Sequence, residues 1–458
     1  HLSLDGVIVE SRWLMVGTSA LRCDRAGASG RGYTVVTISP EVVMRCLCVV
    51  SVVLLVFSVG CHMPARMTAS PDGSQAIYGA NLSERVLLID ARDGKTLREL
   101  GAGSGSAAWS HDGRHAWYAV RTTADDPASP ELDPALWTVE MPGLELFPAP
   151  DPGGIDNVEE PTEQETIHLL ESGRSRPLVT LPGRVWEIVP ASDADWLLVS
   201  YAAELRLHND RKTFGVLAAY SVTRNKLYPL SAIDGLNLLA AFTSDGQAVF
   251  VKPTDPSGTL GMLVSMKLDP DAKPDPNELA MVAFAGTGFA RRVGDELWVT
   301  TMALALPAEM KALEESAPLH SLYRVQVKER RLERIRENVG QLFVPSPDAK
   351  RVLFESVEVR GGNKERSLSV MDVASGAVSD LRRVSDYPEL PMFPSWAGNE
   401  EILFVAEPGK SEPATRDDKP VAVYDVVRYR LDQGTLKFVA TLSGGWEKLT
   451  KPGHTLKD

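Results

Sequence analysis

Cysteine is scarce in this sequence and absent from most of it. The four cysteines, Cys23, Cys46, Cys48 and Cys61, all lie within the first 61 of 458 residues. Residues 62–458 therefore contain no thiol that could form a disulfide, act as a nucleophile or bind a metal. A disulfide-stabilised fold, a cysteine-dependent enzyme and a cysteine zinc site are excluded for that part of the chain.

The chain also lacks an excess of positive charge. It carries 48 Lys and Arg against 61 Asp and Glu, which gives a formal net charge of −13. Binding to nucleic acid requires a basic face that neutralises phosphates. We therefore expect no nucleic-acid partner.

Long apolar runs are missing as well. The longest, Leu47–Val59, is shorter than the ~20 residues of a membrane-spanning helix but has the size of a secretory apolar region of ~7–15 residues. Met44 and Arg45 precede it, and Gly60 and Cys61 follow. The alternatives are a buried strand or core helix, and secretion without a lipid.

The end of this segment resembles the lipobox of bacterial lipoproteins, although Ser58 stands where that motif usually has Leu. The resemblance implies export, lipidation of Cys61 and attachment to a membrane of the cell envelope. We expect translation to start at Met44. Residues 1–43 are then an untranslated or unstructured leader, 44–60 a signal peptide and 61–66 a lipidated tether.

One short pattern recurs along the rest of the chain. "SPDGSQAIYGA" begins at Ser70, "SHDGRHAWYAV" at Ser110 and "SPDAKRVLFES" at Ser346. Weaker turns precede similar apolar runs at 197–199, 249–251, 297–299 and 402–404. Asp and Gly favour tight turns, and a short apolar run after a turn predicts a buried strand. We assign a structural role in these turns to Asp72, Gly73, Asp112, Gly113, Asp245, Gly246 and Asp348.

A hairpin pattern follows most of these strands, with a Gly-containing turn between two apolar segments. Examples are residues 86–100, 168–181, 368–381 and 429–442. Two hairpins per repeat predict a four-stranded antiparallel blade, and such blades stack into a ring. We expect seven blades, although six or eight also fit, because the longest repeat contains an additional predicted hairpin at 135–149.

These turns and strands resemble the TolB-like, WD-repeat-like β-propeller family. The resemblance implies an all-β propeller over residues 67–446 and a C-terminal tail at 447–458. Similar repeats form the propeller of prolyl oligopeptidases, but their hydrolase motif G-x-S-x-G is absent here. The family resemblance therefore implies no peptidase activity.

Segments rich in Pro, Gly and charge interrupt the repeats and predict loops. They are residues 121–134, 151–165, 305–318, which has a helical core, and 407–420. The first, third and fourth follow the second strand of a blade, so we expect them on one rim of the ring. Long loops on one face of a rigid scaffold commonly form binding surfaces.

Two functions remain open from the sequence. The first is a non-enzymatic envelope lipoprotein, without a cofactor, that binds another envelope protein or a polymer. The second is a propeller enzyme, lactonase-like or hydrolase-like, that uses carboxylates in the central channel with or without Ca²⁺. No P-loop, G-x-G-x-x-G or sialidase motif is present, and we assign no catalytic, cofactor-binding or metal-binding residue.

Overall fold

A computed structural model describes most of the chain after residue 65. The described residues are 66–79, 85–130, 132–137, 144–145, 164–192, 195–207, 210–233, 239–254, 260–283, 288–301, 320–360, 363–381, 394–406, 414–416, 419–421 and 423–443. The chain divides into two compact units, 1–61 and 62–458, and all described residues belong to the second. The predicted leader, signal peptide, Cys61 and C-terminal tail lie outside the described residues, among which no helix is long and apolar enough to cross a membrane.

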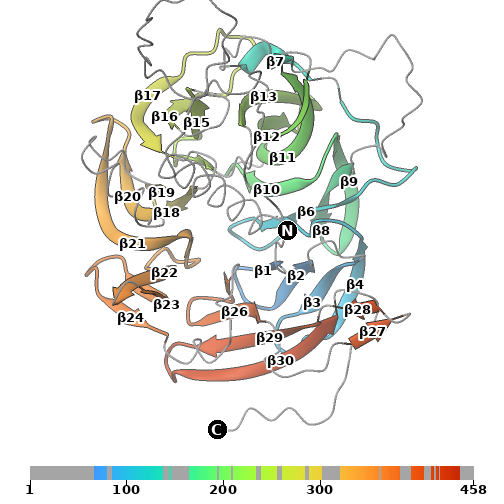
Figure 1. Ribbon diagram of the computed structural model, residues 1–458. Coiled ribbons are helices and arrows are strands. Elements are labelled where there is room, and N and C mark those ends of the chain that lie inside the picture. Colours follow the sequence, from blue (N-terminus) through green and yellow to red (C-terminus); the bar gives the residue numbers. More distant parts are fainter. Residues whose placement is uncertain are drawn as a thin grey trace, which may run out of the picture. The chain divides into compact units, whose positions relative to one another are not determined.

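The described residues are almost entirely β-strands, joined in antiparallel sheets that follow chain order (Figure 1). The first sheet contains β1 (Arg66–Ala69), β2 (Gln75–Gly79), β3 (Val86–Asp90) and β4 (Thr96–Gly101). The second contains β5 (Ala107–Trp109), β6 (His115–Arg121), β8 (Glu165–Glu171) and β9 (Arg174–Leu181). The third contains β10 (Val185–Pro190), β11 (Trp196–Leu207), β12 (Asp210–Ser221) and β13 (Lys226–Ile233), and the short β7 (Leu144–Glu145) pairs with β11.

The remaining sheets continue this arrangement. The fourth contains β14 (Ala240–Phe242), β15 (Ala248–Pro253), β16 (Leu260–Met266) and β17 (Asn277–Ala283). A seven-stranded sheet contains β18 (Phe289–Val293), β19 (Glu296–Thr301), β20 (His320–Gln326), β21 (Arg331–Pro345), β22 (Arg351–Arg360), β23 (Asn363–Asp372) and β24 (Val378–Asp380). The last four-stranded sheet contains β25 (Ser395–Trp396), β26 (Glu401–Ala406), β29 (Val423–Arg430) and β30 (Thr435–Ser443).

The repeated turns have a common hydrogen-bond pattern. The N–H of Ser70 donates to the carbonyl of Gln75 at 2.8 Å, and the N–H of Gly73 donates to the carbonyl of Ser70 at 2.8 Å. The turns at Ser110 and Ser346 repeat both bonds. All seven apolar runs predicted after turns lie within strands, namely β2, β6, β11, β15, β19, β22 and β26.

The sheets form a β-propeller, because their first strands contact one another in a closed cycle. β1 contacts β5, and the cycle continues through β10, β14, β18, the end of β21 and β25 back to β1. A buried apolar cluster joins the first and last sheets, including Met67 and Ile89 from one and Leu403 and Val426 from the other. Burying side chains of this size contributes about 1.5–3 kcal/mol each.

Two tryptophans bond neighbouring first strands to each other. The indole N–H of Trp109 in β5 donates to the carbonyl of Thr68 in β1 at 3.0 Å. The indole N–H of Trp396 in β25 donates to the carbonyl of Val344 in β21 at 2.9 Å. Both residues occupy the same position of the repeat, immediately before the turn. They therefore join neighbouring blades.

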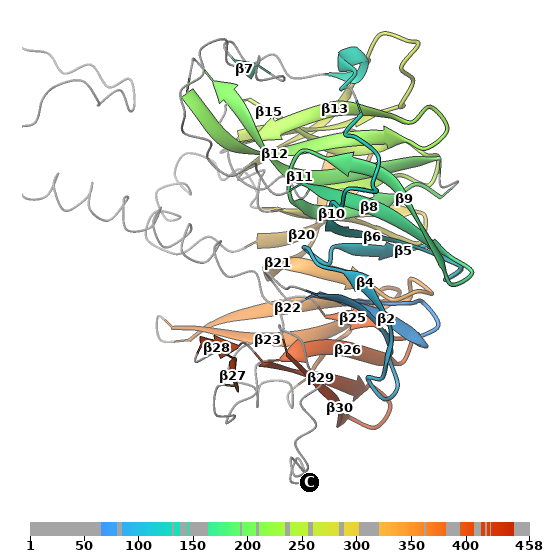
Figure 2. The same cartoon turned by 90° about the vertical axis from the view of Figure 1, so that its right-hand side faces the viewer.

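Strand β21 belongs to two four-stranded groups at once. Its first part pairs with β20, and its last residues, Phe343–Pro345, pair with β22 (Figure 2). The register shifts between Val339 and Phe343, where the strand passes from one group to the next. Since β18 to β24 form one continuous sheet, the count of seven blades stays a prediction.

Two predicted segments differ from the structure. The predicted hairpin at 135–149 is wrong where the structure describes it: Pro134–Leu136 is a 3-10 turn, and β7 pairs with β11 of the third sheet. Leu136 is fully buried between the third and fourth sheets, so tertiary packing decides its conformation. The predicted loop 407–420 contains β27 (Ala414–Arg416) and the start of β28 (Lys419–Val421), which pair with each other.

Glycine allows the connection into the third sheet to pass directly beside a strand. A Cβ atom on Gly183 would overlap the carbonyl oxygen of Ala202 in β11. The same crowding recurs at Gly288 beside Thr300 in β19. The connections that enter these first strands therefore require a residue without a side chain.

We predict that Gly183→Ala lowers the free energy of unfolding by about 1–3 kcal/mol, because the added methyl displaces backbone. Urea denaturation measures the change. Gly376→Asn is the control, since no atom lies within 4 Å of its Cβ position and its φ of +70° is one that Asn tolerates. Equal stability of Gly183→Ala and wild type would contradict the close approach.

Candidate functional site at the propeller axis

Charged residues from several blades meet where the first strands begin. Arg66 opens β1, Glu187 lies near the start of β10 and Arg291 lies in β18. β1 and β10 are separated around the ring by β5, and β10 and β18 are separated by β14. Side chains that join these strands must therefore reach past the first strand that lies between them. We call Arg66, Ser106, Arg184, Trp186, Glu187 and Arg291 the axial cluster.

Arg66 provides the first link between these strands. Its Nη1 donates to the hydroxyl of Ser106 at 2.7 Å and to the carbonyl oxygen of Trp186. The hydroxyl of Ser106 lies 2.9 Å from the carbonyl oxygen of Val185. Burial lowers the pKa of Arg66 to about 10, against the attraction of Glu187. The guanidinium therefore stays charged at neutral pH.

An ion pair provides the second link. Glu187 Oε1 lies 2.5 Å from Arg291 Nη2, and the two side chains are 11% and 26% exposed. Burial raises the pKa of Glu187, while the charges of Arg291 and Arg66 oppose this shift. Its second carboxylate oxygen is buried and has no hydrogen-bond partner among the described residues. One oxygen of this carboxylate is thus available to a ligand or water.

A β-bulge places Trp186 in the cluster. Val185 and Glu187 pair with Tyr201 and Ser200 of β11, which leaves Trp186 as the additional residue. Bulges of this kind redirect side chains and are common beside functional sites. The indole packs against the core around β18 to β22, with Arg184 Cζ 5.3 Å from its ring centroid. Its N–H is buried without a partner among the described residues.

Glu165 holds the backbone that carries this cluster. It is 2% exposed, and its two oxygens accept the N–H groups of Ser104, at 2.5 Å, and Val185, at 2.6 Å. Burial raises the pKa of Glu165, and the two N–H groups oppose the shift. Glu165 therefore fixes both connections, to β5 and to β10, from which Ser106 and Trp186 reach the axis.

The axial cluster is cationic within an acidic chain. Arg66, Arg184 and Arg291 face Glu187, and the buried Glu165 attracts Arg66 and Arg184 as well. Three positive charges thus meet two carboxylates, whereas the whole chain has a net charge of −13. In antiparallel blades, the start of the first strand and the end of the second lie on the same rim. The segments that follow β6, β19 and β26 therefore leave the sheets on the rim of the axial cluster, as predicted for three of the loops.

The predicted turn residues lie on the opposite rim. The carboxylates of Asp72, Asp112 and Asp348 accept the backbone N–H two residues further on, at 3.0–3.1 Å. Asp245 accepts the hydroxyl of Thr243 instead. Gly73, Gly113 and Gly246 have φ between +69° and +81°, which glycine adopts without strain.

Sequence patterns did not predict the axial cluster. The described residues contain no group of three or more His, Cys, Asp or Glu side chains arranged around a common point. His111 and His115 lie on either side of a turn, and His115 Nε2 is 2.9 Å from Glu171 Oε1. The segment "RVWE", residues 184–187, in which an arginine and a glutamate enclose an apolar pair, is a local signal of the axial cluster.

Comparison with known proteins adds distant structural likenesses. No family model and no curated protein matches the chain. TolB from Acinetobacter baumannii is similar at 12% identity, covering 81% of this chain and 77% of its own, with a TM-score of 0.40. An oligogalacturonate lyase from Vibrio parahaemolyticus shares 10% identity over 75% and 87%, with a TM-score of 0.43. The β-propeller domain of the Trilobed protease from Pyrococcus furiosus shares 8% over 82% and 98%, with a TM-score of 0.35.

These likenesses are too distant to bear on function. The fold assignment stands on the strand order and the closed cycle of first strands.

We predict that Arg291→Met lowers the free energy of unfolding by about 3 kcal/mol at neutral pH, because it leaves the buried Glu187 carboxylate unpaired. The loss should shrink as the pH falls through the raised pKa of Glu187, since protonation removes the unpaired charge. Denaturant titrations at several pH values measure both effects.

Glu187→Gln combined with Arg291→Met is the matched control and should recover most of the stability. Additive losses in the double variant, or a loss independent of pH, would show that the ion pair does not hold the axis together.

Proposed function

We propose that this protein is a non-enzymatic binding scaffold of the cell envelope. Cys61 carries the lipid that attaches it to a membrane, and the propeller presents the rim of the axial cluster to another envelope protein. The partner supplies an acidic segment that reaches the axis. No cofactor takes part.

The cationic axial cluster is the observation that supports this proposal. Arg291 remains 26% exposed, so part of its charge is accessible from solvent. A guanidinium donates several N–H groups in a plane and matches a carboxylate in geometry. An acidic chain repels polyanions in general, so a local cationic site favours ligands that can present a carboxylate at the axis.

The alternative is a propeller enzyme that uses channel carboxylates, with or without Ca²⁺. The one carboxylate of the axial cluster, Glu187, is already paired with Arg291. A rise in melting temperature on adding Ca²⁺ would favour the enzyme, and its absence with Ca²⁺, Mg²⁺ and Mn²⁺ would favour the scaffold.

We predict that chemical cross-linking in native membranes, followed by purification of the protein, captures one recurrent acidic envelope protein. Arg184→Gln should reduce its recovery at least fivefold, because a positive charge is lost at the axial rim. Arg174→Gln, at an exposed hairpin end on the opposite rim, is the matched control. Equal recovery with both variants would contradict the assigned face, and recovery of an acidic polymer would replace the protein partner.

A separate prediction concerns the anchor. Cys61→Ser should move the protein from the membrane fraction to the soluble fraction after export, because a thioether-linked lipid cannot form on serine. Fractionation with immunoblotting measures the distribution, and a Cys48→Ser variant controls for changes within the signal segment. Membrane association that persists in Cys61→Ser would rule out the lipid anchor.

A further inference from the structure

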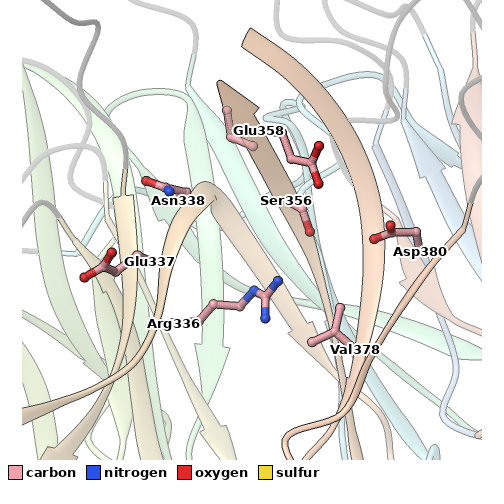
Figure 3. A pocket seen from close by; sticks show the side chains of 8 residues that line it. Arg336, Glu337, Asn338, Ser356, Glu358, Val378 and Asp380 are labelled. Carbon is pink, nitrogen blue, oxygen red and sulfur yellow. The ribbon is translucent and has the colours of Figure 1, made fainter. Parts of the chain in front are cut away.

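A cavity of about 320 Å³ lies where β21 passes between two groups of strands (Figure 3). β21 supplies one wall, and β22 and β24 supply the other. The volume is at the lower end of the ~300–1,000 Å³ typical of small-molecule sites. Its lining residues are Arg336, Glu337, Asn338, Ser356, Val357, Glu358, Val378 and Asp380.

The β21 wall presents one guanidinium without an ion pair. Arg336 Cζ lies 5.4 Å from the ring centroid of Phe354, which is almost completely buried. No described carboxylate lies within ion-pair distance of Arg336. The neighbouring Glu337 is already paired, since its Oε1 lies 2.6 Å from Arg334 Nη1. The aromatic ring thus positions a cation whose N–H groups remain available to a ligand.

The opposite wall presents a carboxylate at the end of a hydroxyl chain. The hydroxyl of Ser369, which is fully buried, donates to Asp380 Oδ1 at 2.7 Å. Ser356 Oγ lies 2.6 Å from Ser369 Oγ, so the Ser356 hydroxyl donates to Ser369. These bonds fix the carboxylate of Asp380 while its second oxygen makes no bond to a described residue.

Arg336 and Asp380 face the same space from opposite walls and do not pair with each other. Figure 3 shows both side chains pointing into the cavity, which Ser356 and Glu358 also line. A ligand that carried only a negative charge would meet Asp380 and Glu358, and one that carried only a positive charge would meet Arg336. A molecule with a charge of each sign at its two ends satisfies both walls.

We propose that this cavity binds a small zwitterion of the amino-acid class. The carboxylate of the ligand binds the Arg336 guanidinium, and its ammonium group binds Asp380. The ligand thereby bridges the two groups of strands that share β21. This site is independent of the axial cluster and of any macromolecular partner.

Isothermal titration calorimetry with residues 62–458 tests whether the cavity binds a zwitterion. It also shows which separation of the ligand's two charges fits the cavity best. The probes are glycine, 4-aminobutyrate and 6-aminohexanoate, which separate the two charges by increasing distances, and butyrate and butylammonium, which each carry one charge. We expect one zwitterion to bind at least tenfold tighter than both singly charged probes. If butyrate bound as tightly as the zwitterions, the cavity would be an anion site and the proposal would be wrong. If no zwitterion bound, the proposal would also be overturned.

Paired variants locate the binding within the molecule. Arg336→Gln and Asp380→Asn should each weaken binding of that zwitterion at least tenfold, and the asparagine keeps an acceptor for Ser369. Arg331→Gln is the control, because Arg331 lies exposed on the same strand and bonds Gln326 outside the cavity. Melting curves of the free variants establish that they are folded. Unchanged affinity in either cavity variant would contradict the assignment.

Discussion

Burial of the Arg66 guanidinium at the axis is the interaction on which the arrangement of the first strands depends. A charged group removed from water is costly unless hydrogen bonds and opposite charges replace its hydration. Here the replacements come from the next two blades around the ring, from the Ser106 hydroxyl before β5 and the Trp186 carbonyl in β10. Strands that are not neighbours in the ring must therefore keep a fixed separation. The Glu187–Arg291 pair imposes the same requirement on β10 and β18.

The contacts that close the ring between the first and last sheets also hold the first strands in place. Since no single strand pairs the first sheet with the last, the ends are joined by packing and by side-chain bonds. Ala69 N–H donates to Ser395 Oγ at 2.9 Å, and Arg428 Nη2 donates to the carbonyl of Ala91 at 2.8 Å. The shared strand β21 joins its two groups of strands in a different way, through continuous backbone pairing rather than through side chains. The small cavity with Arg336 and Asp380 lies at that junction, where the register shift separates β21 from β22.

Much of the fold could be predicted because its signals are local. A turn such as Ser70–Gly73 is determined by its own residues, and the apolar run that follows is buried wherever the blade packs. The prediction of a hairpin at 135–149 was wrong, because Leu136 is placed by contacts with the third and fourth sheets rather than by its neighbours in the chain. The close approach at Gly183 was also missed, because its reason is the Ala202 carbonyl in an adjacent strand.

The axial cluster could not be predicted for the same physical reason. Arg66 and Trp186 are 120 positions apart, and nothing in either local sequence indicates that they meet. Which arginines face a channel depends on strand register and on a single bulge at Trp186. A shift of one residue would turn each of these side chains to the other face of its strand.

The most direct test of the account is a titration of the propeller with hexaglutamate, followed by tryptophan fluorescence at increasing salt. The account predicts a saturable signal that disappears in Trp186→Phe and weakens as salt screens the axial arginines. A saturable signal that is unchanged in Trp186→Phe, or no saturable signal at low salt, would contradict binding of an acidic group at the axis.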